Sequence, residues 1–115
     1  MDDIVFLGKK RRFTLEEARD VLPAVRRVTE RAVKSVAAAR ERREEGVSEE
    51  AHREALDEIV RLWADQVGKL GGEAKGLWLV DFDNGGGYYC WRWPERQLSH
   101  YHGYEEGFSG RTPIQ

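Results

Sequence analysis

The apolar residues of this chain follow two different rhythms, one before and one after Gly71-Gly72. Before these glycines, apolar positions recur every three or four residues, which places them along one stripe of a helix. After them, aromatic residues and strand-like alternation dominate. The pattern predicts a single α+β domain over 1–115, with a long antiparallel helical hairpin over 14–70 and a small antiparallel sheet over 73–104.

The first predicted helix begins at Thr14, a favourable N-cap residue, and Glu17 three positions later completes a capping box. Its apolar stripe has a 3-4-3-4 spacing and consists of Leu15, Ala18, Leu22, Val25, Thr29, Ala32, Val36 and Ala39. Pro23 lies inside this stripe and cannot donate a hydrogen bond to the carbonyl of Arg19. Because the stripe continues in phase, we predict a kink at Pro23 rather than a helix end.

The second predicted helix follows a short loop. Gly46 suits a left-handed C-cap of the first helix, and Ser48 suits the N-cap of the second. The second stripe consists of Leu56, Val60, Trp63, Val67 and Leu70. So short a loop makes the helices antiparallel. Their stripes need a further covering surface, which is either the sheet or a second copy of the chain.

Three strands are predicted beyond the hairpin: 77–82, 88–93 and 97–104. Turn-forming residues separate them at 83–87 and 94–96, and connections this short make the strands antiparallel. One face of the first strand, with Trp78, Val80 and Phe82, is expected to pack on the helices. The residues at 105–115 are predicted to form a closing loop or tail.

Charge and composition argue against several classes of protein. With a net charge of −2, the chain has no general attraction for nucleic acid or anionic membranes. The basic run Lys9-Lys10-Arg11-Arg12 is interpreted as a solvated tail, with a nucleic-acid-binding arm as the alternative. No apolar stretch reaches the roughly 20 residues that cross a bilayer, and no signal-peptide pattern is present. A cytoplasmic protein with no membrane partner is expected.

The single cysteine, Cys90, lies in a strand-like aromatic run. The favoured interpretation is a buried, inert thiol, and a nucleophile is the alternative. The carboxylate pairs Asp81/Asp83 and Glu105/Glu106 are interpreted as solvated turn residues rather than as a general acid–base pair.

Two histidines, His100 and His102, share one face of a predicted strand because they are two residues apart. A catalytic zinc site needs a third protein ligand, which Glu95, Glu105, Asp81 or Cys90 could supply. Surface or hydrogen-bonding histidines are the more common case. No metal or cofactor is therefore expected, and His100, His102 and Glu105 are the candidate ligands if a metal binds.

Three blocks of residues, spread from residue 13 to 114, have a distinctive order and spacing. They are Phe13-Thr14-Leu15-Glu16-Glu17-Ala18 with Leu22-Pro23; Leu79-Val80-Asp81-Phe82 with Cys90-Trp91-Arg92 and Glu95; and His102, Glu105, Gly107-Phe108, Gly110-Arg111 and Pro113. Together they resemble a bacterial family known as domain of unknown function 2203. Asp83 and Tyr101 stand where that family has Pro and Trp.

The resemblance implies no established activity, but it singles out a polar cluster. Its members are Asp81, Arg92, Glu95, His102, Glu105 and Arg111. These residues form either a binding or catalytic site or a buried hydrogen-bond network, and the sequence leaves both open.

The leading hypothesis is a non-enzymatic, self-associating protein that forms a homodimer through its helices. The alternative is a small-molecule or metal-dependent enzyme with its site on the sheet. In that case His102 is a ligand or base, Glu105 and Asp81 are its carboxylate partners, and Arg111 binds an anion. Nucleic-acid binding through residues 9–12 is a third possibility. The small-molecule ligand is not identified by the sequence.

Overall fold

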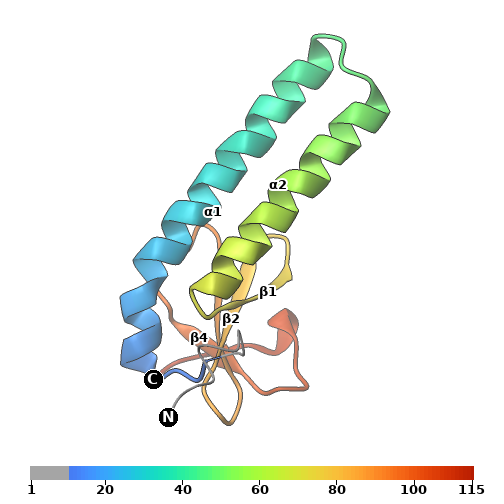
Figure 1. The fold of residues 1–115 in the computed structure, drawn as a ribbon. Helices are drawn as coiled ribbons and strands as arrows, with labels where there is room; N and C mark the ends of the chain where they lie inside the picture. The colour runs from blue at the N-terminus through green and yellow to red at the C-terminus, as the bar shows by residue number, and fades with distance from the viewer. Residues whose placement is uncertain (1–10) are drawn as a thin grey trace.

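A computed structural model describes residues 11–115 as a long helical hairpin that stands on a small sheet (Figure 1). The hairpin consists of α1 (Leu15–Glu44) and α2 (Glu49–Lys69), and its far half extends beyond the sheet. The α+β prediction is therefore confirmed. Lys9 and Lys10 lie outside the described residues, whereas the guanidinium of Arg11 lies over the Phe13 ring, 5.0 Å from its centroid.

Both helices begin where their caps predict. The Thr14 hydroxyl accepts a hydrogen bond from the Glu17 N–H at 3.1 Å, and the Glu17 carboxylate accepts one from the Thr14 N–H at 3.0 Å. Ser48 caps α2, and Gly46 has the left-handed φ of 113°. The helix α1 runs through Pro23 without ending, as expected; the kink itself stays a prediction.

The apolar stripes of the helices form the upper part of the core. The buried members on α1 are Ala18, Leu22, Val25, Thr29, Ala32 and Ala39. Trp63 of α2 is buried among them and donates its indole N–H to the Thr29 hydroxyl at 2.8 Å. That hydroxyl in turn donates to the Val25 carbonyl at 2.8 Å. The polar atoms of this pair are therefore satisfied, which lets the large indole stay inside the core.

The sheet has five antiparallel strands rather than the predicted three. They lie side by side in chain order: β1 (Glu73–Gly76), β2 (Leu79–Asp83), β3 (Tyr88–Arg92), β4 (His100–His102) and β5 (Thr112–Pro113). The prediction missed both edge strands. β1 has hardly any apolar residues and β5 is two residues long, so backbone pairing rather than a side-chain pattern defines them.

Strand boundaries also differ from the predicted ones. Leu77 and Trp78 form the turn before β2, and Trp78 has a φ of 63°. The Trp78 ring still packs edge-on against Trp63, with 4.9 Å between ring centroids. The strand predicted at 97–104 is limited to β4. The predicted tail contains the short 3₁₀ helix η1 (Phe108–Gly110) as well as β5.

The two faces of the sheet differ in character. Val80, Phe82 and Trp91 face the helices and are fully buried, as predicted for the first two. Residues paired directly across antiparallel strands share a face. Asp81 pairs with Cys90, and Tyr88 pairs with His102. The opposite face therefore carries polar side chains.

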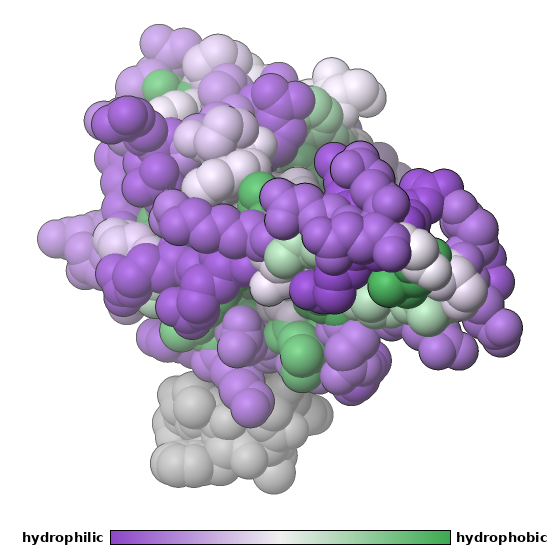
Figure 2. All heavy atoms as spheres, turned by 90° about the horizontal axis from the view of Figure 1, so that it is seen from above, coloured by the Kyte–Doolittle hydropathy of each residue, from purple (hydrophilic) through white to green (hydrophobic). Residues whose placement is uncertain are grey.

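The surface seen from above is mostly hydrophilic, and its apolar side chains form small separate patches (Figure 2). Within residues 11–115, neither helix combines the length and the apolar character that crossing a bilayer requires.

Candidate functional site

Three buried side chains with metal-ligand chemistry meet on the polar face of the sheet. Asp81 of β2, Cys90 of β3 and His102 of β4 are 3%, 2% and 4% exposed. A carboxylate oxygen, the thiol sulfur and a ring nitrogen lie within 4.8 Å of one another. The strand register brings them together, because Asp81 lies opposite Cys90 and β4 lies next to β3. We call these residues the Asp–Cys–His cluster.

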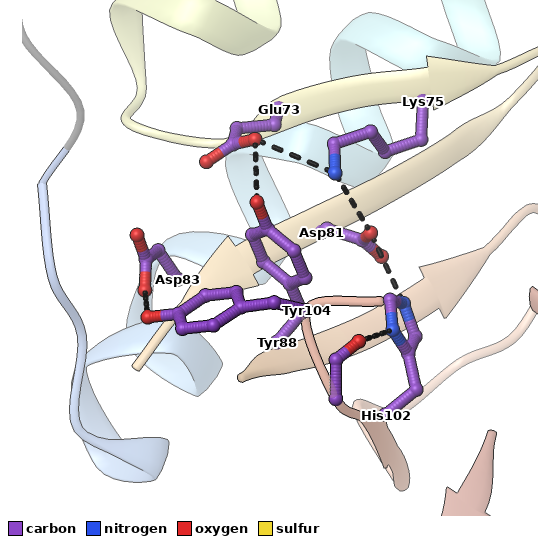
Figure 3. Close-up of polar contacts among 8 residues, drawn as sticks. Glu73, Lys75, Asp81, Asp83, Tyr88, His102 and Tyr104 are labelled. Carbon is purple, nitrogen blue, oxygen red and sulfur yellow. Dashed lines mark hydrogen bonds and ion pairs between the residues drawn. The ribbon is translucent and has the colours of Figure 1, made fainter. Parts of the chain in front are cut away.

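The hydrogen-bond partners of the His102 ring indicate which of its nitrogens carries a proton (Figure 3). Nδ1 lies 2.8 Å from the Gly103 carbonyl oxygen, and Nε2 lies 3.1 Å from the Asp81 Oδ2. A carbonyl only accepts hydrogen bonds, so Nδ1 carries a proton. Nε2 then faces a carboxylate either as the N–H of an imidazolium or as a lone pair directed at a shared cation.

The Cys90 thiol is protonated in this environment. Burial and, to a smaller extent, the Asp81 carboxylate raise its pKa to about 12, while the Arg111 guanidinium opposes the shift. The thiolate is the nucleophilic form of cysteine, so such a thiol is a poor nucleophile. The expectation of a buried thiol is confirmed.

Lys75 of β1 supplies a positive charge at the edge of the cluster (Figure 3). Its Nζ lies 3.5 Å from Asp81 Oδ2 and 3.5 Å from Glu73 Oε1. It also lies 3.9 Å from the centroid of the Tyr88 ring, whose hydroxyl donates to Glu73 at 3.3 Å. Burial lowers the pKa of Lys75, but Tyr88 and the carboxylates outweigh burial and raise it. Lys75 therefore stays cationic.

A cavity of about 260 Å³ opens beside the Asp–Cys–His cluster. It is lined by Lys75, Leu79, Asp81, Cys90, His102, Glu106, Gly107 and Phe108. Residues from four strands, β1 to β4, form one wall, and the segment that follows β4 forms the other. The cavity is small for a ligand site, and it combines polar groups with the apolar side chains of Leu79 and Phe108.

Asp83 shows that the polar face is covered rather than solvated. Asp83 is only 7% exposed, and its Oδ1 accepts a hydrogen bond from the Tyr104 hydroxyl at 2.6 Å and from the Gly85 N–H at 2.9 Å. The interpretation of Asp81 and Asp83 as solvated turn residues is therefore wrong. Both lie in β2, and the residues after β4 fold over this face of the sheet.

A second set of polar contacts, around Glu95, holds the C-terminal segment in place. Arg111 donates from Nη2 to Glu95 Oε2 at 2.5 Å, and its guanidinium stacks on Phe108 at 4.2 Å. The backbone N–H of Arg92 donates to Glu95 Oε1 at 2.9 Å. Partial burial raises the pKa of Glu95, but these hydrogen bonds outweigh it and hold the pKa below its usual value.

The residues singled out by sequence thus separate into different groups. Asp81 and His102 line the cavity, whereas Arg92, Glu95 and Arg111 hold the C-terminal segment. Glu105 is exposed, lies outside the cavity lining, and forms no hydrogen bond or ion pair within residues 11–115.

The metal ligands suggested from sequence are also only partly brought together. His100 is not a member of the Asp–Cys–His cluster, and its Nδ1 is buried without a hydrogen-bond partner among the described residues. Sequence reasoning missed Lys75 and Glu106 as cavity residues. Glu73 and Lys75 lie two residues apart and so share one face of β1. This spacing could have identified Lys75, but β1 itself was not predicted.

The comparisons with known proteins identify a family. A family model described as "Uncharacterized conserved protein (DUF2203)" matches residues 11–114, in agreement with the resemblance noted in the three sequence blocks. No curated protein and no solved structure matches the chain.

Proposed function

We propose that this chain, which belongs to the DUF2203 family, is a metal-dependent enzyme that acts on a small molecule. The metal ion is bound by Asp81, Cys90 and His102. The observation that carries the proposal is the convergence of three buried donor atoms of different types within 4.8 Å, beside a cavity. It departs from the expectation of no metal, and it replaces His100 and Glu105 as candidate ligands.

The donor set favours zinc. Zinc binds thiolate, imidazole and carboxylate at about 2.0–2.3 Å, which puts the donor atoms of a tetrahedral site about 3.3–3.7 Å apart. The 3.1 Å between His102 Nε2 and Asp81 Oδ2 is close to this range, and the other separations stay within 4.8 Å. Binding of a zinc ion would therefore bring the more widely separated donor atoms closer together. The hydrogen bond from Nδ1 to the Gly103 carbonyl supports this arrangement, because it directs the Nε2 lone pair at the metal.

Three protein ligands leave one position of a tetrahedral zinc ion for water or substrate, as in catalytic rather than structural zinc sites. Such an ion polarises a bound carbonyl or lowers the pKa of a bound water to near 7. The cationic Lys75 lies at the rim of the same cavity, and so does the carboxylate-bearing Glu106. The cavity volume of about 260 Å³ favours a small substrate.

Metal binding is tested with Co²⁺, whose bonds to thiolate produce a near-ultraviolet charge-transfer band. The purified chain is titrated with Co²⁺ and then with Zn²⁺. We expect saturation at about one ion per chain and loss of the band when zinc displaces cobalt. Cys90→Ser should abolish the band. His102→Gln and Asp81→Asn should weaken affinity by more than the roughly 10- to 100-fold that changes around a ligand cause.

The matched control is His100→Gln, because His100 lies on the same strand but outside the Asp–Cys–His cluster. It should bind Co²⁺ like the unchanged chain. Absence of the band, or an equal loss in His100→Gln, would contradict the proposal. The Asp81–His102 contact would then be a carboxylate–imidazolium ion pair.

Self-association through the helices is a second candidate function, and it is compatible with the first. Its support is a groove of about 230 Å³ along the hairpin, where Val28, Ala32 and Ile59 border Leu62, whose exposed fraction is 48%. A second copy that packs its own hairpin against this groove would cover these apolar side chains.

A further inference from the structure

A second cavity lies between α1 and the residues that connect β3 to β4. Its lining residues differ in chemical character from those of the first cavity. Its volume is about 430 Å³, and its lining consists of Arg19, Leu22, Pro23, Arg26, Arg96, Gln97 and Leu98. Three of these seven residues are arginines and none is acidic. We call it the arginine pocket.

Within residues 11–115, no acidic side chain neutralises the arginines of this pocket. None of the three forms an ion pair with any residue in the described part of the chain. The chain as a whole has a net charge of −2, so this concentration of positive charge is local. Like charges held close together repel one another unless an anion lies between them.

The individual side chains are arranged to accept a ligand. The Arg19 Nε and Nη2 donate to the Leu98 carbonyl at 3.3 and 3.1 Å, which fixes this guanidinium and leaves its other N–H groups available. Arg26 lies beside Trp93, with 6.0 Å between the guanidinium carbon and the ring centroid. The Arg26 Nε is buried and has no hydrogen-bond partner among the described residues. A buried donor without an acceptor is costly, and a bound anion removes this cost.

The rest of the lining consists of three apolar residues, Leu22, Pro23 and Leu98, and the polar Gln97. A ligand for such a pocket has an anionic group for the guanidiniums and an apolar body for the apolar side chains. Guanidinium forks match the oxygens of a phosphate group, and a phosphate dianion offsets more than one arginine charge.

From this geometry we propose that the arginine pocket binds an organic phosphate, with the phosphate group among Arg19, Arg26 and Arg96. The site does not depend on the metal proposed for the Asp–Cys–His cluster, so either proposal can fail alone.

Isothermal titration calorimetry of the full chain with phenyl phosphate tests the proposal, with benzoate and inorganic phosphate as comparison ligands. We expect saturable binding of phenyl phosphate that is tighter than binding of either comparison ligand. Arg26→Gln should weaken it about tenfold or more, because it removes charge-assisted hydrogen bonds. Arg26→Lys, which keeps the charge without the planar fork, should give an intermediate loss.

The control is Arg40→Gln, which makes the same charge change at an exposed site on the far half of α1. It should change the affinity less than about twofold if the pocket, rather than overall charge, binds the ligand. Three results would overturn the proposal: no saturable binding of phenyl phosphate, tighter binding of benzoate, or equal losses in Arg26→Gln and Arg40→Gln. A change of oligomeric state in Arg26→Gln would also overturn it, because the arginines would then serve a contact between chains.

Discussion

Two of the buried polar contacts in this protein differ in character. Thr29 and Trp63 satisfy each other's hydrogen bonds inside the helical core, and no charge is involved. Asp81 and His102 instead bring ionisable groups together out of water, at 3.1 Å, next to a cavity. Burying ionisable groups is expensive unless a partner or a metal ion compensates. The first contact stabilises the core, whereas the second is the one on which the proposed metal site rests.

The sequence reveals residue types but not which side chains lie next to one another in the fold. The polar residues of the cavity could therefore be predicted only in part. His102 and Asp81 were found because their residue types and the family resemblance attract attention. Their burial was not foreseen, since Asp81 and Asp83 flank a turn-rich stretch that usually faces water. Glu105 was selected over its neighbour Glu106, although only Glu106 lines the cavity. Which of two adjacent carboxylates lines the cavity depends on the local path of the chain, and residue types do not reveal it.

Glu95 predicts a pH dependence of stability. Because its pKa in the folded protein lies below the usual value of 4.5, its ionised form is favoured by folding. Its contribution is present above the pKa of the unfolded chain and is lost as pH falls through the folded pKa. The difference in unfolding free energy between the unchanged chain and Glu95→Gln should thus be constant near neutral pH and shrink below about pH 4.3.

Urea unfolding followed by circular dichroism at a series of pH values measures this difference. Glu105→Gln is the matched control, since Glu105 is exposed and has no ion pair within residues 11–115. Its difference from the unchanged chain should stay near zero throughout. A Glu95→Gln difference that grows as the pH falls would contradict the assigned role of the Glu95–Arg111 pair.

At the scale of elements, the helices were far more predictable than the strands. Helix limits depend on local chemistry, and the caps Thr14, Gly46 and Ser48 all act as their residue types suggest. The central strands β2 and β3 were located approximately. The edge strands β1 and β5 were not, because pairing with a neighbour defines them and their own sequences lack a period. The face that carries the site follows from the register between strands, which single-strand patterns do not specify.

Close backbone approach at Gly87 provides a test of the β3–β4 pairing. A Cβ atom added there would lie 2.7 Å from the His102 backbone oxygen, so Gly87→Ala must push the two strands apart. We expect a loss of about 1–3 kcal/mol in unfolding free energy, measured by chemical denaturation. Displacement of His102 should also weaken Co²⁺ binding at the Asp–Cys–His cluster.

The neighbouring glycine gives the control for this substitution. A Cβ atom on Gly86 meets only the Asn84 Oδ1, at 3.7 Å, which is an ordinary contact. Gly86→Ala should therefore stay within about 0.5 kcal/mol of the unchanged chain. Equal effects of the two substitutions would show that β3 and β4 are not as close as described.

At the scale of the whole molecule, the shape is elongated, with principal extents of 49 × 32 × 25 Å. The hairpin accounts for the long axis, and the sheet covers only its lower half (Figure 1). The overall α+β architecture could be predicted because each of these two parts has its own hydrophobic period. The arginine pocket does not follow from either period. That pocket combines residues near 19–26 with residues near 96–98, and only the packing of the sheet against α1 brings them together.

Self-association makes a prediction at this scale. If a second copy covers the hairpin groove, Leu62→Glu should place a charge in the interface and shift the chain to monomers. Sedimentation velocity at several micromolar concentrations measures the shift. Leu77→Glu is the control, because Leu77 is more exposed at 62% but lies in the turn before β2, away from the groove. A chain that is monomeric without any substitution would rule out the helical dimer.

The covering of the polar face by residues that follow β4 has a consequence for biosynthesis. The ribosome releases the hairpin first, then the central strands, and only afterwards the segment with Phe108 and Arg111. Asp81, Cys90 and His102 can therefore be enclosed only after residues 106–108, which are synthesised later than all three, have folded onto the sheet. If a metal ion binds there, as we propose, enclosure of the ion depends on the part of the domain that is made after the strands.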